Sequence, residues 1–499
     1  MSSVQAMELS SAKLEKWEPV IGLEIHVQLA TNTKMFCRCT LQFGAEPNTL
    51  TCPVCLAHPG VLPVPNERAI DFAIRVGLAL NCDIAPRTIF HRKNYFYADN
   101  PKAYQISQYD NPICIDGHLD VPDGAGGEFR VGITRAHMEE DAAKLVHAGA
   151  SGRIADSHSS VVDFNRAGTP LVEIVTEPDI RGPEQAKRFL TMLRQTILAI
   201  GVSDCNMEEG SLRCDANISV RPRGTTAFGT KTELKNMNSF RFIERGIHAE
   251  IDRQIEMLER GEDVEQETLH FDPVTGALRS LRSKEQAHDY RYFPEPDLVP
   301  LVIDQAHIDR VRAELVELPI DRMHRFEREY GLSSYDAEVL NLTQELADFY
   351  ERVVELAAAA DAKLVANWVM GEWQALAKDG NEASAEALAA IVEMVADKTI
   401  SGRSGKELLE RVAAHGGDPR AIVEDEGLAQ VSDEGALRAA VQSVLDANEQ
   451  QVAQYHNGKV TIIGFFVGQV MKSMQGKADP QATKALVEEL LGPPANPKE

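Results

Sequence analysis

Charged and imidazole side chains alternate with apolar residues near the start of this chain. In residues 21–29 the odd positions are Ile, Leu or Val, and the even positions include Glu24, His26 and Gln28. Successive side chains of a strand point to opposite faces, so this segment is predicted to be a strand with one buried and one polar face. On the polar face, a carboxylate and an imidazole two residues apart could bind a divalent cation or position a reacting group. The alternative is an ordinary strand face in solvent.

The same alternation continues for longer in residues 211–221. Its even positions are apolar or small, and its odd positions from 213 onward form a polar row of Arg213, Asp215, Asn217, Ser219 and Arg221. In a strand these side chains share one face. Their mixture of hydrogen-bonding types suits a polar ligand, so the segment is a second candidate strand of a site.

Further carboxylates and cations lie in short runs elsewhere in the first 300 residues. They are Glu208 and Glu209, the group Lys231, Glu233 and Lys235, and the run His137, Glu139, Glu140 and Asp141. Adjacent carboxylates repel each other unless a cation or a proton intervenes. Several of them beside Lys and Arg would suit Mg²⁺ and the phosphates of a nucleotide. A solvated acidic surface explains each run taken alone, but their joint presence favours a site.

No standard nucleotide-binding motif accompanies these groups. The nearest approach to a P-loop, residues 402–407, is two residues too short and lacks the hydroxyl. No Gly-x-Gly-x-x-Gly motif follows a predicted strand. The sequence therefore permits ATP binding outside the P-loop and Rossmann designs, without requiring it.

Four cysteines form two close pairs. Cys37 and Cys39 are followed, after twelve residues, by Cys52 and Cys55. Two close pairs joined by a loop are typical of a four-thiolate zinc site. Four protein ligands leave no open position on the ion, so such a zinc would be structural, and buried free thiols are the alternative. Cys82, Cys114, Cys205 and Cys214 stand alone and are predicted to be core residues or residues without a special role.

Two segments combine positive charge with other features that suit RNA. Residues 87–109 mix basic side chains with six aromatic rings, which could hold phosphates and stack on bases. A packed aromatic core with a basic rim explains that segment equally well. Residues 455–478 contain no acid. Their candidate RNA contacts are Lys459, Lys472 and Lys477.

The composition limits the classes of protein to consider. Charged residues make up 25% of the chain and hydrophobic residues 43%, as in an ordinary globular protein. The net charge of -25 gives no general attraction to DNA, RNA or membranes, so contact with RNA must run through local basic patches. We find no targeting signal and no apolar run of about 18 residues. A cytoplasmic protein with reduced cysteines is therefore expected.

At 499 residues the chain needs more than one hydrophobic core, and its pattern changes near residue 300. Short alternating segments predict strands before that point, and three prolines within residues 294–300 mark a boundary. Helical spacing dominates afterwards, with Ser384 as a possible N-cap. One helical face is predicted from Val339, Leu342, Leu346, Phe349 and Val353. We predict an α+β protein: a mixed or antiparallel sheet domain at 1–298, a helical domain at 299–405 and a small helical tail at 406–499.

Long phrases of the sequence carry a family resemblance. They are residues 21–29, 43–48, 58–64, 92–97, 104–110, 137–142, 163–171, 207–219, 233–240 and 289–297, with 457–459 and 464–469 in the tail. Together they resemble the B subunit of the bacterial aspartyl/glutamyl-tRNA amidotransferases. The match is dense through residues 20–300 and looser beyond.

The resemblance implies a cradle domain that holds the reaction site, a helical domain and a tail domain that binds tRNA. It also implies a heterotrimer with a glutaminase A subunit and a small C subunit. In that family the B subunit uses ATP and Mg²⁺ to phosphorylate the side-chain carboxylate of Glu-tRNA(Gln) or Asp-tRNA(Asn). Ammonia then displaces phosphate and yields Gln-tRNA or Asn-tRNA, which makes the complex a carbon–nitrogen ligase with glutamine as amido donor.

The resemblance also points to site residues in this chain. The expected catalytic residues are Glu24, His26, Glu139, Glu140, Glu209, Asp215, Glu233 and Lys235. Glu24, His26 and Glu140 are expected to hold Mg²⁺. The expected ATP contacts are Arg92, Lys93, Arg213 and Asn217. The prediction of zinc rests only on the spacing of the four cysteines, because not all members of the family have these cysteines.

Two other functions remain to be distinguished. The first is a tRNA-binding scaffold without a catalytic centre. The rows of polar side chains on the predicted strands argue against it, because a scaffold does not need them. A Glu140→Gln substitution would leave a scaffold active. The second is a metal-dependent ligase that acts on a small amino acid. The acid-free, Lys-containing segment of the tail argues against it, because that segment favours tRNA as the substrate.

Overall fold

The computed structural model describes residues 11–148, 157–283, 290–429, 434–474 and 478–493. The chain divides into two compact units, residues 1–322 and 323–499. The first unit is built on a large sheet with helices, and the second is helical among its described residues. The α+β class is thereby confirmed. The division into three domains stays a prediction, and its second boundary, after residue 405, lies inside helix α12 (Gly402–His415).

A nine-stranded sheet forms the first unit, in the order β14-β13-β12-β11-β1-β10-β7-β6-β2. Neighbouring strands are antiparallel except for β12 and β13, which are parallel. The strands of this sheet are β1 (Trp17–Gln28), β2 (Asp83–Ile84), β6 (Cys114–Pro122), β7 (Glu128–Glu140), β10 (Pro170–Thr176), β11 (Leu212–Pro222), β12 (Thr232–Met237), β13 (Glu267–Phe271) and β14 (Leu278–Ser283). The strand β1 thus lies between β11 and β10.

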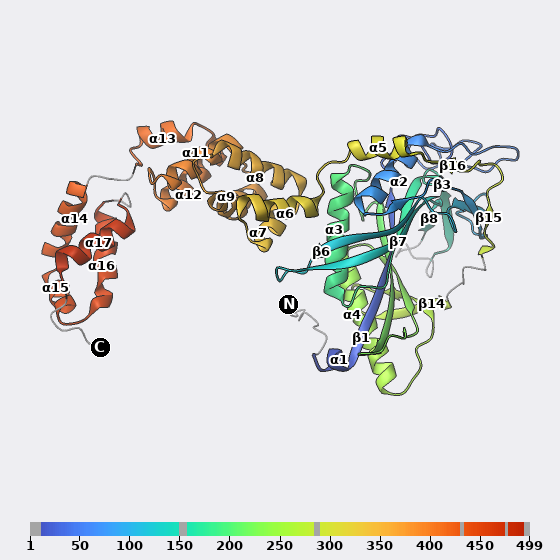
Figure 1. The fold of residues 1–499 in the computed structure, drawn as a ribbon, viewed down its shortest axis with the longest axis horizontal. Helices are drawn as coiled ribbons and strands as arrows, with labels where there is room; N and C mark the ends of the chain where they lie inside the picture. Colours follow the sequence, from blue (N-terminus) through green and yellow to red (C-terminus); the bar gives the residue numbers. More distant parts are fainter. Residues whose placement is uncertain (1–10, 149–156, 284–289, 430–433, 475–477, 494–499) are drawn as a thin grey trace. The chain divides into compact units, whose positions relative to one another are not determined.

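One face of this sheet is covered by helices. The helices α3 (Pro183–Ala199) and α4 (Phe240–Glu259) pack against each other and against β6, β11 and β12, and α2 (Glu67–Ala79) packs on β6 and β7 (Figure 1). The apolar side chains of β1 point into this layer: Ile21, Ile25 and Val27 have no exposed surface. Each such side chain contributes roughly 1.5–3 kcal/mol by burial. The predicted alternation of residues 21–29 and 211–221 is confirmed, since the apolar positions of both segments are buried.

The opposite, polar face of the sheet is bordered by smaller sheets. One of them has the order β15-β4-β5, in which β5 contacts β7 of the large sheet. The strands of the smaller sheets are β3 (Arg87–Thr88), β4 (His91–Asn94), β5 (Tyr104–Ser107), β8 (Lys144–Ala148), β9 (Ser159–Asp163), β15 (Phe293–Pro294) and β16 (Leu301–Val302). The sheet thus has a helix-covered face and a face that is left for polar groups.

Further helices lie at both ends of the first unit. Helix α1 (Ser11–Lys16) precedes β1, and α5 (Gln305–Ala313) packs on α2. In this contact His307 Nε2 lies 2.7 Å and Arg310 Nη2 2.9 Å from Asp71 Oδ1. The helix α6 (Pro319–Tyr330) crosses the division between the two units.

The second unit continues as short helices. They are α7 (Ser334–Leu340), α8 (Gln344–Leu356), α9 (Ala362–Trp368), the π-helical turn Val369–Trp373, α10 (Gln374–Lys378), α11 (Ala385–Ala396), α12 and α13 (Pro419–Asp425). Ser384 caps α11 as predicted. The single helical face predicted from Val339 to Val353 is wrong, because the helix breaks between α7 and α8. Thr343 starts a new helix there, and Leu342 is left exposed.

The last part of the chain forms its own apolar cluster. Its helices are α14 (Glu434–Asp446), α15 (Glu449–His456), the 3₁₀ turn Val460–Ile462, α16 (Ile463–Ser473) and α17 (Pro480–Leu491). Val441, Phe466, Val470 and Val487 have no exposed surface in this cluster. No helix of the described residues is long and apolar enough to cross a membrane.

Candidate active site

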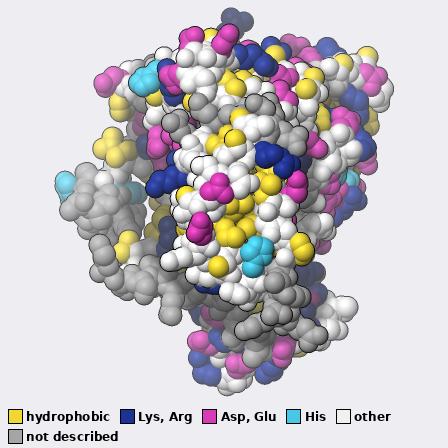
Figure 2. Space-filling model, turned by 90° about the vertical axis from the view of Figure 1, so that its left-hand side faces the viewer, with side chains coloured by type: hydrophobic (Ala, Val, Ile, Leu, Met, Phe, Trp, Pro, Cys, Tyr) yellow, Lys and Arg dark blue, Asp and Glu magenta, His cyan; other side chains and the backbone are white. Residues whose placement is uncertain are grey.

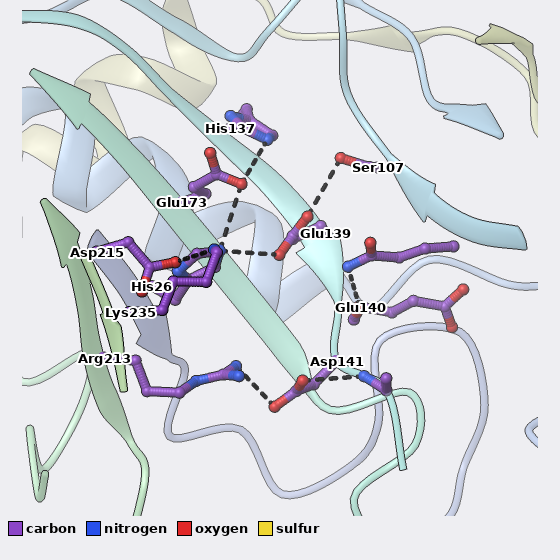
Figure 3. Close-up of polar contacts among 12 residues, drawn as sticks. His26, Ser107, His137, Glu139, Glu140, Asp141, Glu173, Arg213, Asp215 and Lys235 are labelled. Carbon is purple, nitrogen blue, oxygen red and sulfur yellow. Dashed lines mark hydrogen bonds and ion pairs between the residues drawn. The ribbon is translucent and has the colours of Figure 1, made fainter. Parts of the chain in front are cut away.

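Three neighbouring strands bring an imidazole and two carboxylates together on the polar face of the sheet. His26 of β1 is the cross-strand partner of Glu173 of β10, and Glu139 comes from the end of β7. The imidazole Nε2 of His26 lies 3.5 Å from Glu173 Oε2 and 3.7 Å from Glu139 Oε1 (Figure 3). One ligand atom from each residue falls within 4.8 Å of the other two. Residues 26, 139 and 173 are called the triad below.

The two carboxylates of the triad are buried, His26 is partly exposed, and the charges of the three groups depend on one another. Burial raises the pKa of Glu139, and the charge of Glu173 raises it further. Burial raises the pKa of Glu173 too, but His137 and His26 outweigh it and hold that pKa well below its usual range. Burial lowers the pKa of His26, while the hydrogen bond and charge of Glu173 and the charge of Glu139 raise it to about 9. Without a metal ion, a proton on His26 therefore balances part of the carboxylate charge.

A second imidazole and an ammonium group complete these surroundings. His137 Nε2 lies 3.5 Å from the same Glu173 oxygen, and its Nδ1 is buried without a hydrogen-bond partner among the described residues. Burial lowers the pKa of His137 to about 4. Burial also opposes charge on Lys93, but Glu139 and other anionic groups outweigh it and raise its pKa. Ser107 of β5 donates a hydrogen bond of 3.4 Å to Glu139.

A second polar group lies on β1, β11 and β12. Asn217 donates to Glu24 at 2.8 Å, and Lys235 Nζ lies 2.5 Å from Asp215 Oδ2 and 3.2 Å from Glu233 Oε1. Glu24 and Asp215 are cross-strand partners. The structure thus gathers five of the predicted site residues beside the triad, with one ammonium group set among three carboxylates.

His26 of the triad and two members of this group, Asp215 and Lys235, line a large cleft of about 1170 Å³. Its lining includes His26, Asp215 and Lys235 together with Glu209, Arg213 and loop residues such as Phe43, which is 66% exposed. The described charged residues of the lining are His26, Lys144, Asp163, Arg166, Asp204, Glu208, Glu209, Arg213, Asp215 and Lys235. A cleft of this size that holds both acidic and basic groups can accept a polyanion together with a cation.

The structure does not bring every predicted site residue to this cleft. Glu140 points away from the triad, where its carboxylate pairs with Lys102 and accepts from the backbone N–H of Ile106 (Figure 3). Arg92 is held by a bidentate pair with Glu295, at 2.7 and 2.8 Å. The roles of Glu140 in Mg²⁺ binding and of Arg92 in ATP binding stay predictions.

The predicted tRNA contacts lie elsewhere in the chain. Lys459 lies just before the 3₁₀ turn Val460–Ile462, and Lys472 is exposed near the end of α16. Lys477 lies outside the described residues.

The four paired cysteines meet in one cluster. The Sγ atoms of Cys39 and Cys52 lie 4.0 and 3.9 Å from that of Cys55, and Cys37 belongs to the same group. A tetrahedral zinc with Zn–S bonds of about 2.3 Å sets the sulfurs about 3.8 Å apart, so the cluster fits this ion. The hydrogen bond from Cys37 lowers the pKa of Cys55, and the charge of the buried Lys34 lowers it further against the effect of burial. The four single cysteines are buried, as expected of core residues.

Glu173 was missed by the sequence reasoning, although a signal existed. It is a lone carboxylate in the apolar strand Pro-Leu-Val-Glu-Ile-Val-Thr, residues 170–176. A charged residue in a strand that is otherwise buried needs a partner or a cation. His137 was noted as part of an acidic run, but its contact with Glu173 depends on strand pairing that the sequence does not reveal.

Comparisons with known proteins agree with this architecture. The GatB/GatE catalytic domain family matches residues 19–309, and the GatB domain family matches residues 348–491. Relatives in Geotalea uraniireducens and Geobacter sulfurreducens are each 53% identical over 95% of this chain and 98% of their own length. One in Carboxydothermus hydrogenoformans is 50% identical over 96% of this chain and 99% of its own. Each of the three is named as the B subunit of an aspartyl/glutamyl-tRNA(Asn/Gln) amidotransferase. With this coverage and identity, the chain belongs to the B-subunit family of the aspartyl/glutamyl-tRNA(Asn/Gln) amidotransferases.

Proposed function

We propose that this chain carries the centre at which the side-chain carboxylate of Glu-tRNA(Gln) or Asp-tRNA(Asn) is activated by ATP and converted to the amide. The observation that carries the proposal is the triad, whose His26 lines a cleft of about 1170 Å³ while its two carboxylates lie buried behind that ring. A tRNA-binding scaffold has no use for two buried carboxylates that face one imidazole, because burying them without a cation costs free energy.

The residues of the triad fit a divalent cation such as Mg²⁺. Glu139 and Glu173 supply oxygen ligands, and His26 supplies Nε2 once its proton has left. Such an ion, when bound, supplies positive charge that neutralises phosphate oxygens. Glu24, Asp215 and Glu233 can hold water molecules or a second part of the substrate, because they lie on the same face of the sheet. Glu209 lines the same cleft from a loop.

The proposed reaction has two displacement steps. An oxygen of the substrate carboxylate attacks the γ-phosphorus of ATP, a P–O bond forms, and the bond to ADP breaks. Ammonia then attacks the carbonyl carbon of the acyl phosphate, a C–N bond forms as the C–O bond breaks, and inorganic phosphate leaves and can take up the proton that the nitrogen loses. Phosphoryl transfer depends mainly on positioning and charge neutralisation. Burial alone would lower the pKa of Lys235, but the charges of Asp215 and Glu233 have the larger effect and raise it. The ammonium group of Lys235 therefore stays protonated and can help to neutralise phosphate oxygens.

Partners follow from the family. We propose a heterotrimer in which an A subunit releases ammonia from glutamine and a small C subunit completes the complex, in the cytoplasm. Lys and Arg side chains are interspersed with Asp and Glu on the face of the molecule in Figure 2, in keeping with the net charge of -25. Contacts with tRNA must therefore be local, and Lys459, Lys472 and Lys477 are proposed for them. Zinc is proposed for the cysteine cluster, as a structural ion.

The test uses the chain with its partner subunits, Mg-ATP and ammonium chloride as nitrogen source. Gln-tRNA or Asn-tRNA is measured after incubation with Glu-tRNA(Gln) or Asp-tRNA(Asn). We expect product that requires ATP but not glutamine. A Glu139→Gln complex should bind tRNA normally and lose turnover by about two orders of magnitude or more. The matched control is Glu177→Gln, which lies just beyond β10 and bonds only Thr134 among the described side chains. Full activity of the Glu139→Gln complex would favour the scaffold instead.

A further inference from the structure

Two guanidinium groups share one buried carboxylate at the wall of the cleft. Arg213 Nη2 donates to Asp141 Oδ2 at 2.9 Å, and Arg166 Nε lies 3.5 Å from the same oxygen (Figure 3 shows Arg213 and Asp141). The side chain of Asp141 is only 6% exposed, whereas those of Arg213 and Arg166 are 38% and 36% exposed. Both arginines line the cleft. The carboxylate thus anchors two cations that face the space where a substrate would lie.

The anchor itself is firmly held. Arg166 donates to the carbonyl oxygens of Ala142 and Ala143, at 2.9 Å each. Asp141 Oδ1 accepts from the backbone N–H of Ala142, and the backbone N–H of Asp141 donates to the carbonyl oxygen of Thr169 at 2.8 Å. A guanidinium held in place before binding loses less conformational entropy when it captures a ligand.

Arg213 has hydrogen-bonding capacity to spare. Its Nε is buried and has no hydrogen-bond partner among the described residues. A buried donor without a partner costs free energy, so such a group is expected to gain a partner when a ligand arrives. Arg213 is also the cross-strand partner of His26, which sets the arginine beside the triad.

The balance of charge around the cleft favours an anion at this place. Lys235 is neutralised by Asp215 and Glu233. The two arginines share a single carboxylate and keep a net charge of about +1 between them. Four acids, Asp163, Asp204, Glu208 and Glu209, remain in the lining, against one further lysine, Lys144. An anionic group that enters the cleft is therefore attracted to the arginine pair and repelled by much of the remaining wall.

We propose that Arg166 and Arg213 form a phosphate-binding subsite, with Asp141 as the positioning residue that aims both guanidinium groups. The inference rests on the proposed function, because it assigns the subsite to a substrate of that reaction. The phosphate belongs either to the nucleotide or to the 3′-terminal backbone of the tRNA. The position beside His26 favours the nucleotide, since one polyphosphate can then reach the triad and the arginine pair together. Planar guanidinium groups suit this ligand because they bind phosphate oxygens in pairs.

The experiment compares Arg166→Ala, Asp141→Asn and Arg130→Ala in the complete complex, with ammonium chloride as nitrogen source. Arg130 is the matched control: it lies on the same strand as Glu139 and makes an exposed bidentate pair with Asp120, at 2.7 and 2.8 Å. The KM for ATP, the KM for aminoacyl-tRNA and kcat are measured, together with the melting temperature. Arg166→Lys, which keeps the charge, is the second variant where Arg166→Ala fails to fold.

We expect Arg166→Ala to raise the KM for ATP about tenfold to a hundredfold and to leave the KM for aminoacyl-tRNA unchanged. Added guanidinium ion should restore part of the loss, whereas urea should not. Asp141→Asn should raise the same KM by less, because both arginines remain. Arg130→Ala should behave as the unsubstituted complex does.

Each other outcome is equally decisive. A rise in the KM for aminoacyl-tRNA alone would still support the subsite and would assign its phosphate to tRNA. Unchanged KM values for both substrates, or an equal effect of Arg130→Ala, would overturn the subsite while leaving the proposed function intact. A fall in kcat and melting temperature without a KM change or guanidinium rescue would show a purely structural role and overturn it too. ATP-independent product in the unsubstituted complex would overturn the proposed function and this inference with it.

Discussion

Replacing Glu173 with Gln removes the carboxylate on which two imidazoles converge. The Oε2 atom of Glu173 lies 3.5 Å from the Nε2 atoms of both His26 and His137. The substitution keeps the size of the side chain and removes its charge. In the metal-free protein, it also removes the group that does most to hold the pKa of His26 up against burial.

The size of the effect follows from these contacts. The pKa of about 9 for His26, against an ordinary value of 6.5, corresponds to roughly 3 kcal/mol of net stabilisation of the charged ring. Glu173 and Glu139 share this effect, so loss of Glu173 should return the pKa of His26 toward its ordinary range. A bound cation would lose one of three ligands, and a lost charged partner is worth about 1.5–3 kcal/mol. We therefore expect the affinity for a divalent cation to fall about tenfold to 150-fold.

The assay has two parts. Titration calorimetry with Mn²⁺ as probe gives the affinity for the cation, and NMR of the histidine rings in chelator-treated protein gives the pKa of His26. Glu177→Gln is the control, since this exposed carboxylate beyond β10 bonds Thr134 and lies outside the cleft lining of the described residues. Unchanged Mn²⁺ affinity together with an unchanged pKa of His26 would refute the view of the triad as a cation site.

Three further predictions concern the stability of separate parts. Cys55→Ser should lower the zinc content of the purified chain, measured by atomic emission, because Cys55 is in contact with two other thiols of the cluster. Burial raises the pKa of Asp71, but Arg310 and His307 outweigh it and lower that pKa. Its stabilising effect should thus be complete above pH of about 4 and be lost as the pH falls through the folded pKa. The melting temperatures of Asp71→Asn and the unsubstituted chain should differ at neutral pH and converge in acid. Phe466→Ala should destabilise the tail helices by about 3–5 kcal/mol, seen in denaturant unfolding, because this ring has no exposed surface.

Alternation along single strands was predictable from the sequence, and the side chains of β1 show why. In a strand the side chains alternate between two faces, so the apolar odd positions of residues 21–29 are buried and the even positions share the polar face. Glu24 and His26 were therefore assigned correctly to the polar face. The same rule separates neighbouring residues of β7. Since Glu139 and Glu140 are adjacent, only one of them can face His26, and the structure gives that place to Glu139. Both carboxylates were predicted as site residues, and that prediction did not use the period of two.

Pairing between distant strands could not be predicted from the sequence. Glu173 meets His26 because β10 pairs with β1 in one register, although the two strands lie far apart in the sequence. Arg166 and Asp141 meet through loops whose path no periodicity describes. The break between α7 and α8 was missed for a local reason, since the N-cap Thr343 lies inside an apolar pattern that continues across it. Local chemistry could be predicted where it depended on one strand, and not where it depended on pairing.

The precision of the triad is set by the opposite face of the same strands. A shift of β1 by one residue against β10 would turn His26 toward the helices and bring Ile25 to the polar face. That shift is opposed by Ile21, Ile25 and Val27, which are fully buried against the helical layer. The register that aligns His26 with Glu173 is thus fixed by apolar side chains on the opposite face of the sheet. Arg166 comes instead from a loop, and needs the shared carboxylate of Asp141 to hold its guanidinium in place. Strand register therefore orders the triad and Arg213, whereas a buried ion pair and two backbone carbonyl groups order Arg166.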